Sequence, residues 1–232
     1  MSKVILVASG KGGTGKTTVT SALGVLLGEK GETVIALDCD PLGGLDIAYG
    51  CGERAIYDIG DAVNGNCAMS AALAAIPLPL KKNRAAHGLL RYAKLGDVRN
   101  DAIASVFANL RKRCGYILCD CPAGSVRTEL ADCADVLLLV TNIGDSCNRA
   151  ASAIRQDAQF GRSLEAVLAV NRVERSQLRK QRVTLDDSID DIGAKLIGWA
   201  KTIDNLHAET DGWRRRDFNE FREIAVRLQT NE

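Results

Sequence analysis

Residues 9–18, Ser-Gly-Lys-Gly-Gly-Thr-Gly-Lys-Thr-Thr, decide the fold class of this chain. They follow the apolar run of residues 3–8, which is typical of a strand, and they precede a stretch with the apolar spacing of a helix. From Gly10 to Thr17 the spacing is G-x-x-x-x-G-K-T. A strand, a glycine-rich loop of this spacing and a helix, in this order, are typical of a phosphate-binding loop. The sequence therefore predicts a phosphate site near the N-terminus.

Each kind of residue in this loop has a physical task. Glycine permits the backbone conformations that let several N–H groups converge on phosphate oxygens. Lys16 supplies a positive charge for the β- and γ-phosphates, and the Thr17 hydroxyl is placed to ligate Mg2+. A helix that begins at about Thr17 directs the positive end of its dipole at the anion. The residues that we expect to hold the phosphates are Gly10, Lys11, Gly12, Gly13, Thr14, Gly15, Lys16, Thr17 and Thr18.

Two further apolar runs end in carboxylates. Residues 34–38 end in Asp38, with Asp40 two positions later, and residues 116–120 end in Asp120. Because open α/β sheets bind ligands at the carboxyl ends of their strands, these acids are expected beside the loop. Asp120 is expected to hold Mg2+, mainly through its waters, and Asp38 to support the metal shell together with Thr17. Asp40 is expected to orient the attacking water, although the roles of Asp38 and Asp40 are not separated by sequence alone.

Apolar runs and helical spacing alternate along most of the chain, which is typical of crossover units around a parallel sheet. Strands are expected at residues 3–8, 33–38, 116–119, 136–140, 164–170 and 196–200. Helices are expected from about residue 17 and at residues 56–63, 69–76, 101–113 and 218–228. Residues 81–96 are a less regular, basic stretch whose local structure the sequence does not define. The predicted fold class is therefore α/β, a doubly wound, mainly parallel β-sheet flanked by helices, as in P-loop NTPases. No linker or repeat divides residues 1–232, so we expect a single domain.

Bulk composition narrows the class of protein. The formal net charge is +1, which provides no general surface for polyanions and argues against a nucleic-acid partner. We expect no secretory leader, because the apolar run of residues 4–8 is far too short, and no apolar run is long enough to cross a bilayer. Eight cysteines without a leader indicate a cytoplasmic protein with free thiols. Cys119 and Cys121 fall on one side of a strand, where they either hold a metal or, as we prefer, pack as small hydrophobic side chains.

Lys11 is a second lysine within the loop, which an ordinary phosphate loop does not need. The pattern K-G-G-x-G-K-T-T of residues 11–18 resembles the deviant Walker A loop of the MinD/ParA family of ATPases. Residues 40–50 and the segment Asp120-Cys-Pro-Ala-Gly124 are similar to the two switch regions of the branch that positions bacterial division sites. The similarity is good over about the first 150 residues and weaker beyond them.

This resemblance implies a Mg2+-dependent ATPase that hydrolyses ATP slowly and forms a homodimer when ATP is bound. In the family the extra lysine reaches the partner's nucleotide, which implies a catalytic set of Lys11, Lys16 and Asp40. The resemblance also assigns Asn171, with Arg172 beside it, to recognition of adenine, and an Asn amide has the donors and the acceptor that a purine edge needs. A switch of this kind acts through a protein regulator or effector that binds the dimer.

Departures from the family's pattern leave alternatives open. Residues 218–228 carry an apolar stripe after Arg214–Arg216, which either packs as a final core helix, as we favour, or lies on the inner face of the cell membrane. Trp199 begins a Trp-Ala-Lys-Thr segment where the family has an Ile-Pro turn, so the far wall of the adenine pocket is not defined. One rival function is that of a metallocentre-maturation ATPase of CooC/NifH type, using Cys119 and Cys121. Another is that of a ParA-type DNA partition ATPase, with basic patches at Lys81, Lys82 and Arg84 or at Arg179–Arg182.

Overall fold

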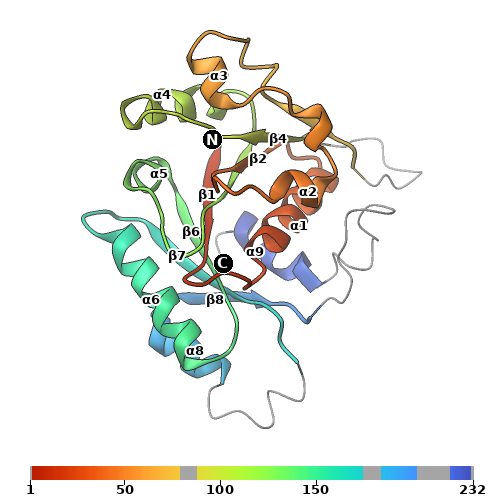
Figure 1. Ribbon diagram of the computed structural model, residues 1–232. Coiled ribbons are helices and arrows are strands. Elements are labelled where there is room, and N and C mark those ends of the chain that lie inside the picture. Colours follow the sequence, from red (N-terminus) through yellow and green to blue (C-terminus); the bar gives the residue numbers. More distant parts are fainter. Residues whose placement is uncertain (1, 79–87, 175–183, 203–219, 231–232) are drawn as a thin grey trace.

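The computed structural model describes residues 2–78, 88–174, 184–202 and 220–230. Within these residues the strands form an eight-stranded sheet in the order β3-β4-β2-β5-β1-β6-β7-β8 (Figure 1). The strands are β1 (Lys3–Ala8), β2 (Val34–Asp38), β3 (Ala74–Ile76), β4 (Leu90–Lys94), β5 (Tyr116–Asp120), β6 (Val136–Thr141), β7 (Glu165–Val170) and β8 (Lys195–Trp199). All neighbouring pairs are parallel except β3 and β4, which are antiparallel. The prediction of a mainly parallel sheet is confirmed.

Helices cover both faces of the sheet, as Figure 1 shows with α1 and α9 on one side and α6 and α8 on the other. The helices are α1 (Lys16–Glu29), α2 (Leu45–Tyr49), α3 (Ile59–Val63), α4 (Asn100–Arg111), α5 (Thr128–Cys133), α6 (Asp145–Gln159), α8 (Leu185–Ile192) and α9 (Arg222–Thr230), with a 3-10 turn η1 (Gly52–Arg54). The core consists of two hydrophobic clusters, and strand β1 contributes side chains to both. Val4, Leu6 and Ala8 pack into one cluster, and Ile5 and Val7 pack into the other. A strand that is covered on both faces reads as a continuous apolar run, which is why the central strands were visible in the sequence.

The sheet order reverses at β1, which lies between β5 and β6. The chain runs outward from β1 to β2 on one side and from β6 to β8 on the other. In doubly wound sheets, ligands bind at the carboxyl ends of the strands at such a switch point. The loop of residues 9–15, between β1 and α1, is located there.

One predicted element is wrong. Residues 69–76 contain no helix, and Ala74–Ile76 instead form the short edge strand β3. Within the stretch 81–96, whose local structure the sequence left open, Leu90–Lys94 form β4 and pair in parallel with β2. The alanines of residues 71–75 suit a helix, but pairing with β4 overrides this local preference at the edge.

The helix expected over residues 56–63 begins only at Ile59. Asp58 is its N-cap, because the Asp58 carboxylate accepts a hydrogen bond from the Asp61 N–H at 2.8 Å. In return, the Asp61 carboxylate accepts a hydrogen bond from the Asp58 N–H. This reciprocal capping fixes the start of the helix.

The described part of the predicted C-terminal helix packs into the core. Phe221, Ile224, Ala225 and Leu228 are at most 3% exposed and join the cluster on the α1 face. Lys3 Nζ donates to the Leu228 carbonyl at 2.8 Å, so the end of α9 is tied to β1. This placement agrees with the core-packing interpretation. Arg214–Arg216 and Phe218 lie outside the described residues. Among the described residues, no helix is long and apolar enough to span a membrane.

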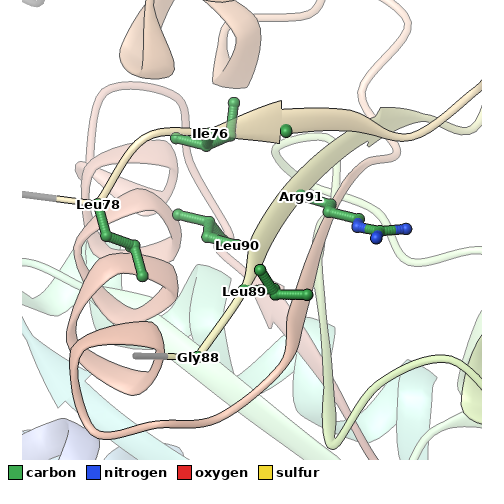
Figure 2. A pocket seen from close by; sticks show the side chains of 7 residues that line it. Ile76, Leu78, Gly88, Leu89, Leu90 and Arg91 are labelled. Carbon is green, nitrogen blue, oxygen red and sulfur yellow. The ribbon is translucent and has the colours of Figure 1, made fainter. Parts of the chain in front are cut away.

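A hollow of about 220 Å³ lies at the β3 edge of the sheet, away from the loop of residues 9–15. Ile76 at the end of β3 and Leu78 just beyond it border the hollow on one side, and Leu89 and Leu90 at the start of β4 border it on the other (Figure 2). Its lining is mainly apolar, with Arg91 at one end. It contains none of the residues that we predicted for the phosphate site.

Candidate functional site

The loop that follows β1 ends in a helix start of unusual geometry. Gly13 and Gly15 have φ values of 77° and 89°, which lie in the left-handed region that glycine adopts without strain. Gly15 is the N-cap of α1 and offers no side chain to cap the first turn. The first N–H groups of α1 therefore remain available to an anion, and the helix dipole favours one there.

Asp120 at the end of β5 is the polar centre of the site. Its Oδ1 accepts hydrogen bonds from Lys16 Nζ at 2.8 Å and Thr20 Oγ1 at 3.0 Å. Its Oδ2 accepts from Thr17 Oγ1 at 2.7 Å. Asp120 has no exposed surface and Lys16 is 7% exposed, so this ion pair is held away from water. The structure thus brings Lys16, Thr17 and Asp120 together, as the sequence predicts, and their roles toward a nucleotide stay predictions.

Asp38 lies beside Asp120, because the two residues are register partners in the parallel pair of β2 and β5. The Asp38 carboxylate accepts from the N–H groups of Asp40 at 3.1 Å and of Leu45 at 3.2 Å. Burial raises the pKa of Asp38 to about 6, and the nearby negative charge of Asp120 adds to this effect while the Leu45 N–H opposes it. Two adjacent buried carboxylates are a pair that a cation would stabilise.

Asp40 is less buried and takes part in the turn that follows β2. Its Oδ1 accepts from the Leu42 N–H at 3.0 Å, and its carbonyl accepts from the Gly43 N–H at 2.9 Å. The carboxylate therefore stabilises this turn. A role of Asp40 in orienting water stays a prediction.

The first half of the loop is fixed between α6 and the segment after β5. A Cβ atom at Gly10 would stand 2.2 Å from the backbone carbon of Ala150 in α6. The Gly124 N–H donates to the Ser9 carbonyl at 2.8 Å, and Ser9 Oγ donates to the Lys11 carbonyl at 3.0 Å. Lys11 itself is exposed at the surface of the loop. The second lysine thus faces outward from a loop whose backbone is held firmly.

Asn171, which follows β7, lies against the same loop. Its side chain is almost fully buried, and Nδ2 donates to the Thr14 carbonyl at 2.9 Å. This contact with the loop was missed by the sequence analysis, which assigned Asn171 to the base alone. Arg172 is exposed and has a φ of 56°, the only positive φ of a non-glycine residue among those the structure describes. Trp199, at the end of β8, is 37% exposed.

The donor set fits Mg2+. Thr17, Asp38 and Asp120 offer the hydroxyl and carboxylate oxygens that this hard cation prefers. In the described part of the chain, no cluster of three His, Cys, Asp or Glu residues forms a ready-made metal cage. Mg2+ is usually bound by one or two carboxylates together with substrate phosphates, so the arrangement suits it. Thr14 Oγ1, also in this loop, is buried without a hydrogen-bond partner among the described residues.

The three cysteines that adjoin Asp38 and Asp120 in the sequence are part of the core. Cys119 and Cys121 have no exposed surface, and Cys39 is 7% exposed. Burial raises the pKa of the Cys121 thiol well above its usual range, and burial likewise raises the pKa of Cys119. Because metals bind the thiolate, these environments favour the packing interpretation of Cys119 and Cys121. The basic patches proposed for DNA, at residues 81–84 and 179–182, lie outside the described residues.

Comparison with known proteins gives a consistent result. The family model described as CobQ/CobB/MinD/ParA nucleotide binding domain matches residues 5–203. The septum site-determining protein MinD of Bacillus subtilis is 34% identical over 199 residues, which cover 83% of this chain and 72% of that protein. MinD of Synechocystis sp. is 29% identical over 216 residues, covering 85% of this chain and 75% of that protein.

Solved structures show the same fold. MinD from Pyrococcus horikoshii, complexed with Mg-ADP, superposes with a TM-score of 0.78 at 22% identity, covering 100% of this chain and 97% of that one. A MinC:MinD cell division protein complex from Aquifex aeolicus gives a TM-score of 0.79 at 24% identity, with coverage of 100% and 97%. At these identities the structures support the fold alone.

Proposed function

The chain belongs to the CobQ/CobB/MinD/ParA nucleotide-binding domain family, and from this premise we propose that it is an ATP-operated switch that dimerises with ATP and hydrolyses it slowly. The observation that carries the proposal is the convergence of Lys16, Thr17 and Thr20 on the fully buried carboxylate of Asp120. Such a buried, fully bonded arrangement holds a lysine and a threonine in fixed positions at the start of α1, where an anion is stabilised.

The residues have separate tasks toward Mg-ATP. Lys16 exchanges part of its contact with Asp120 for the β- and γ-phosphates. Thr17, Asp38 and Asp120 would hold Mg2+, which neutralises phosphate charge when it is bound. Asp40, in the turn after β2, orients the attacking water, and its contribution is positional because its carboxylate lies near the metal site. Asn171 and Arg172 contact the adenine base.

The outward-facing Lys11 supports the dimeric part of the proposal. Lys11 is exposed on a loop that Gly10 and Gly124 hold in place, so its ammonium group can reach a second copy of the chain. There it would stabilise phosphate charge on the partner's nucleotide. Because each copy completes the other's site, dimerisation and hydrolysis are coupled.

The cellular role that we propose is the placement of division sites or another positioning task in the cytoplasm. The support is the name of the relatives, since MinD proteins are called septum site-determining proteins. The Aquifex protein was crystallised together with MinC, so we infer that a protein regulator binds this chain as well. A single domain over residues 1–232 is part of the same proposal.

Light scattering with purified protein tests the switch. The wild type is expected to be monomeric with Mg-ADP and dimeric with Mg-ATP. Lys16→Ala should remain monomeric in both, because it binds the phosphates much more weakly. Asp40→Ala should stay dimeric with Mg-ATP, because it does not hydrolyse ATP. Lys11→Ala should bind ATP yet remain monomeric, while Lys112→Ala, at an exposed lysine beyond α4, serves as the charge-matched control. A wild type that is monomeric with every nucleotide contradicts the proposal.

A further inference from the structure

Two asparagine side chains from neighbouring strand ends meet on one carbonyl of the phosphate loop. Asn142 follows β6 directly and Asn171 follows β7 directly. The two strand ends are joined, because the Asn171 N–H donates to the Thr141 carbonyl at 2.8 Å. Both side chains lie next to Thr14, which is 3% exposed.

Asn171 provides the shorter contact. Its Nδ2 donates to the Thr14 carbonyl at 2.9 Å, and Asn171 is only 4% exposed. A buried hydrogen bond of this kind has no water to replace it when it is lost. Asn171 is therefore held against the loop from the side of β7.

Asn142 approaches the same oxygen from β6. In the amide orientation that satisfies its neighbours, the Asn142 side-chain nitrogen donates to the Thr14 carbonyl at 3.3 Å and to the Asn171 carbonyl at 3.1 Å. A carbonyl oxygen has two lone pairs, so it can accept both amides at once. Asn142 thus binds both the loop and the strand end that carries Asn171.

The loop has a glycine at the position where the Asn171 amide approaches its backbone most closely. A Cβ atom at Gly15 would stand 2.1 Å from Asn171 Nδ2, and Gly15 has a φ of 89°. Glycine at position 15 is required by the backbone and also by the close approach of the Asn171 amide. The shape of the loop before Lys16 thus depends on a residue that follows β7.

We propose that Asn142 and Asn171 are positioning residues that clamp the Thr14 carbonyl and hold the phosphate loop in its binding shape. Because the Asn171 amide nitrogen is engaged by the loop, its oxygen remains the group that faces a base donor such as an exocyclic amino group. Asn171 therefore links base recognition to phosphate binding through one side chain. This inference rests on the proposed nucleotide site and adds to it a residue role that concerns the phosphates.

Inorganic tripolyphosphate, a ligand without a base, separates this role from base contact alone. We expect Asn171→Asp to weaken binding of both Mg-ATP and Mg-tripolyphosphate by about tenfold, because a carboxylate oxygen would face the Thr14 carbonyl in place of a donor. Asn142→Ala should weaken binding of both ligands to a smaller extent, since its contact with the loop is longer. Affinities are obtained from the ligand-dependent rise of the melting temperature, which reports weak ligands reliably at high concentration.

Arg172→Asn is the matched control. Arg172 is the next residue, is exposed, and does not take part in the clamp; asparagine tolerates its left-handed backbone. This variant should weaken binding of Mg-ATP and leave binding of Mg-tripolyphosphate unchanged. Far-UV circular dichroism and the melting temperature without ligand show whether each variant is folded.

Each outcome decides between the alternatives. If Asn171→Asp and Asn142→Ala bind tripolyphosphate as the wild type does, the clamp is wrong, whether or not ATP affinity falls. The clamp is also wrong if the variants have lower melting temperatures but unchanged affinities, because the two residues would then have only a structural role. It is wrong as well if the wild type binds ATP but not tripolyphosphate. A folded wild type that binds neither ligand contradicts the proposed nucleotide site itself.

Discussion

At the scale of single residues, the site is governed by charges that are kept from water. Asp120 has no exposed surface, and its only cationic partner among the described residues is Lys16, at 2.8 Å. Desolvation makes such a pair sensitive to loss of either member, because the remaining charge is buried without compensation. Loss of Asp120 is therefore expected to destabilise the fold, and the pair holds Lys16 in a fixed position.

Asp120→Ala is expected to lower the free energy of unfolding by about 3–5 kcal/mol, because it leaves the buried Lys16 ammonium unpaired. Urea denaturation without nucleotide measures this loss. Asp101→Ala is the control: Asp101 pairs with Arg99 at 3.0 Å, but both side chains are exposed, so the loss should be much smaller. Equal losses in the two variants would show that the Lys16–Asp120 pair has no special place in the folded state.

Asp38 gives the protein a defined pH dependence. Its pKa of about 6 lies above the ordinary 3.8 of the unfolded chain, so the folded protein binds this proton more tightly. The resulting stability is fully present below pH 4 and is lost as the pH rises through about 6. The size of this contribution is about 3 kcal/mol, from a shift of two pKa units.

Asp38→Asn removes this titrating group and keeps the shape of the side chain. The stability difference between variant and wild type, measured by urea denaturation in the presence of a chelator, should therefore move in favour of the variant between pH 4 and pH 7. A difference that is constant over this range would mean that the Asp38 pKa is not raised in the folded protein.

At the scale of elements, the phosphate loop depends on its neighbours as much as on its own sequence. Gly10 contacts the backbone of α6 at Ala150, and Gly124, after β5, bonds to Ser9. The loop is thus fixed from both sides before α1 begins at Lys16.

Gly10→Ala should disturb both the fold and the site, because the new methyl group would stand 2.2 Å from the Ala150 backbone carbon and push the loop away from α6. We expect a lower melting temperature and weakened binding of Mg-ATP, both followed by thermal shift. Gly12→Ala is the control for the fold, because no heavy atom lies within 4 Å of its Cβ position and its φ is not positive. If Gly10→Ala melts like the wild type, α6 does not determine the shape of the loop.

The secondary-structure elements differ in how far the sequence predicts them. The central strands β1, β2, β5, β6 and β7 are covered on both faces, so each has a nearly continuous apolar sequence. This apolar run is visible in each segment alone, without knowledge of its neighbours. The edge strand β3 and its neighbour β4 could not be found in this way, because pairing between distant segments creates them. Helix α8 was missed although its signal is present: Thr184 and Asp187 form a reciprocal cap at its start.

The residues of the site were predictable to a similar degree. Lys16, Thr17, Asp38 and Asp120 follow from a local motif and from the rule that ligands bind at strand ends, and the structure brings them together. The contact of Asn171 with Thr14 spans 157 positions in sequence and could not be read from either segment. Packing between separate loops decides it.

At the scale of the whole molecule, the doubly wound sheet collects the ends of β1, β2, β5, β6 and β7 at one edge. Segments that are far apart in the sequence thus place the start of α1, two carboxylates and two side-chain amides around one loop. The chain belongs to a family of nucleotide-binding domains, and we propose that the nucleotide binds at this edge of the sheet.

Calorimetric titration with Mg-ATP tests this account most directly. The wild type should bind one ATP per chain, and Lys16→Ala should weaken this affinity by about a hundredfold because it removes the charge-assisted contact with the phosphates. Lys112→Ala should bind like the wild type. A folded wild type that produces no binding signal with Mg-ATP, or a Lys16→Ala variant that binds as tightly as the wild type, would contradict the account.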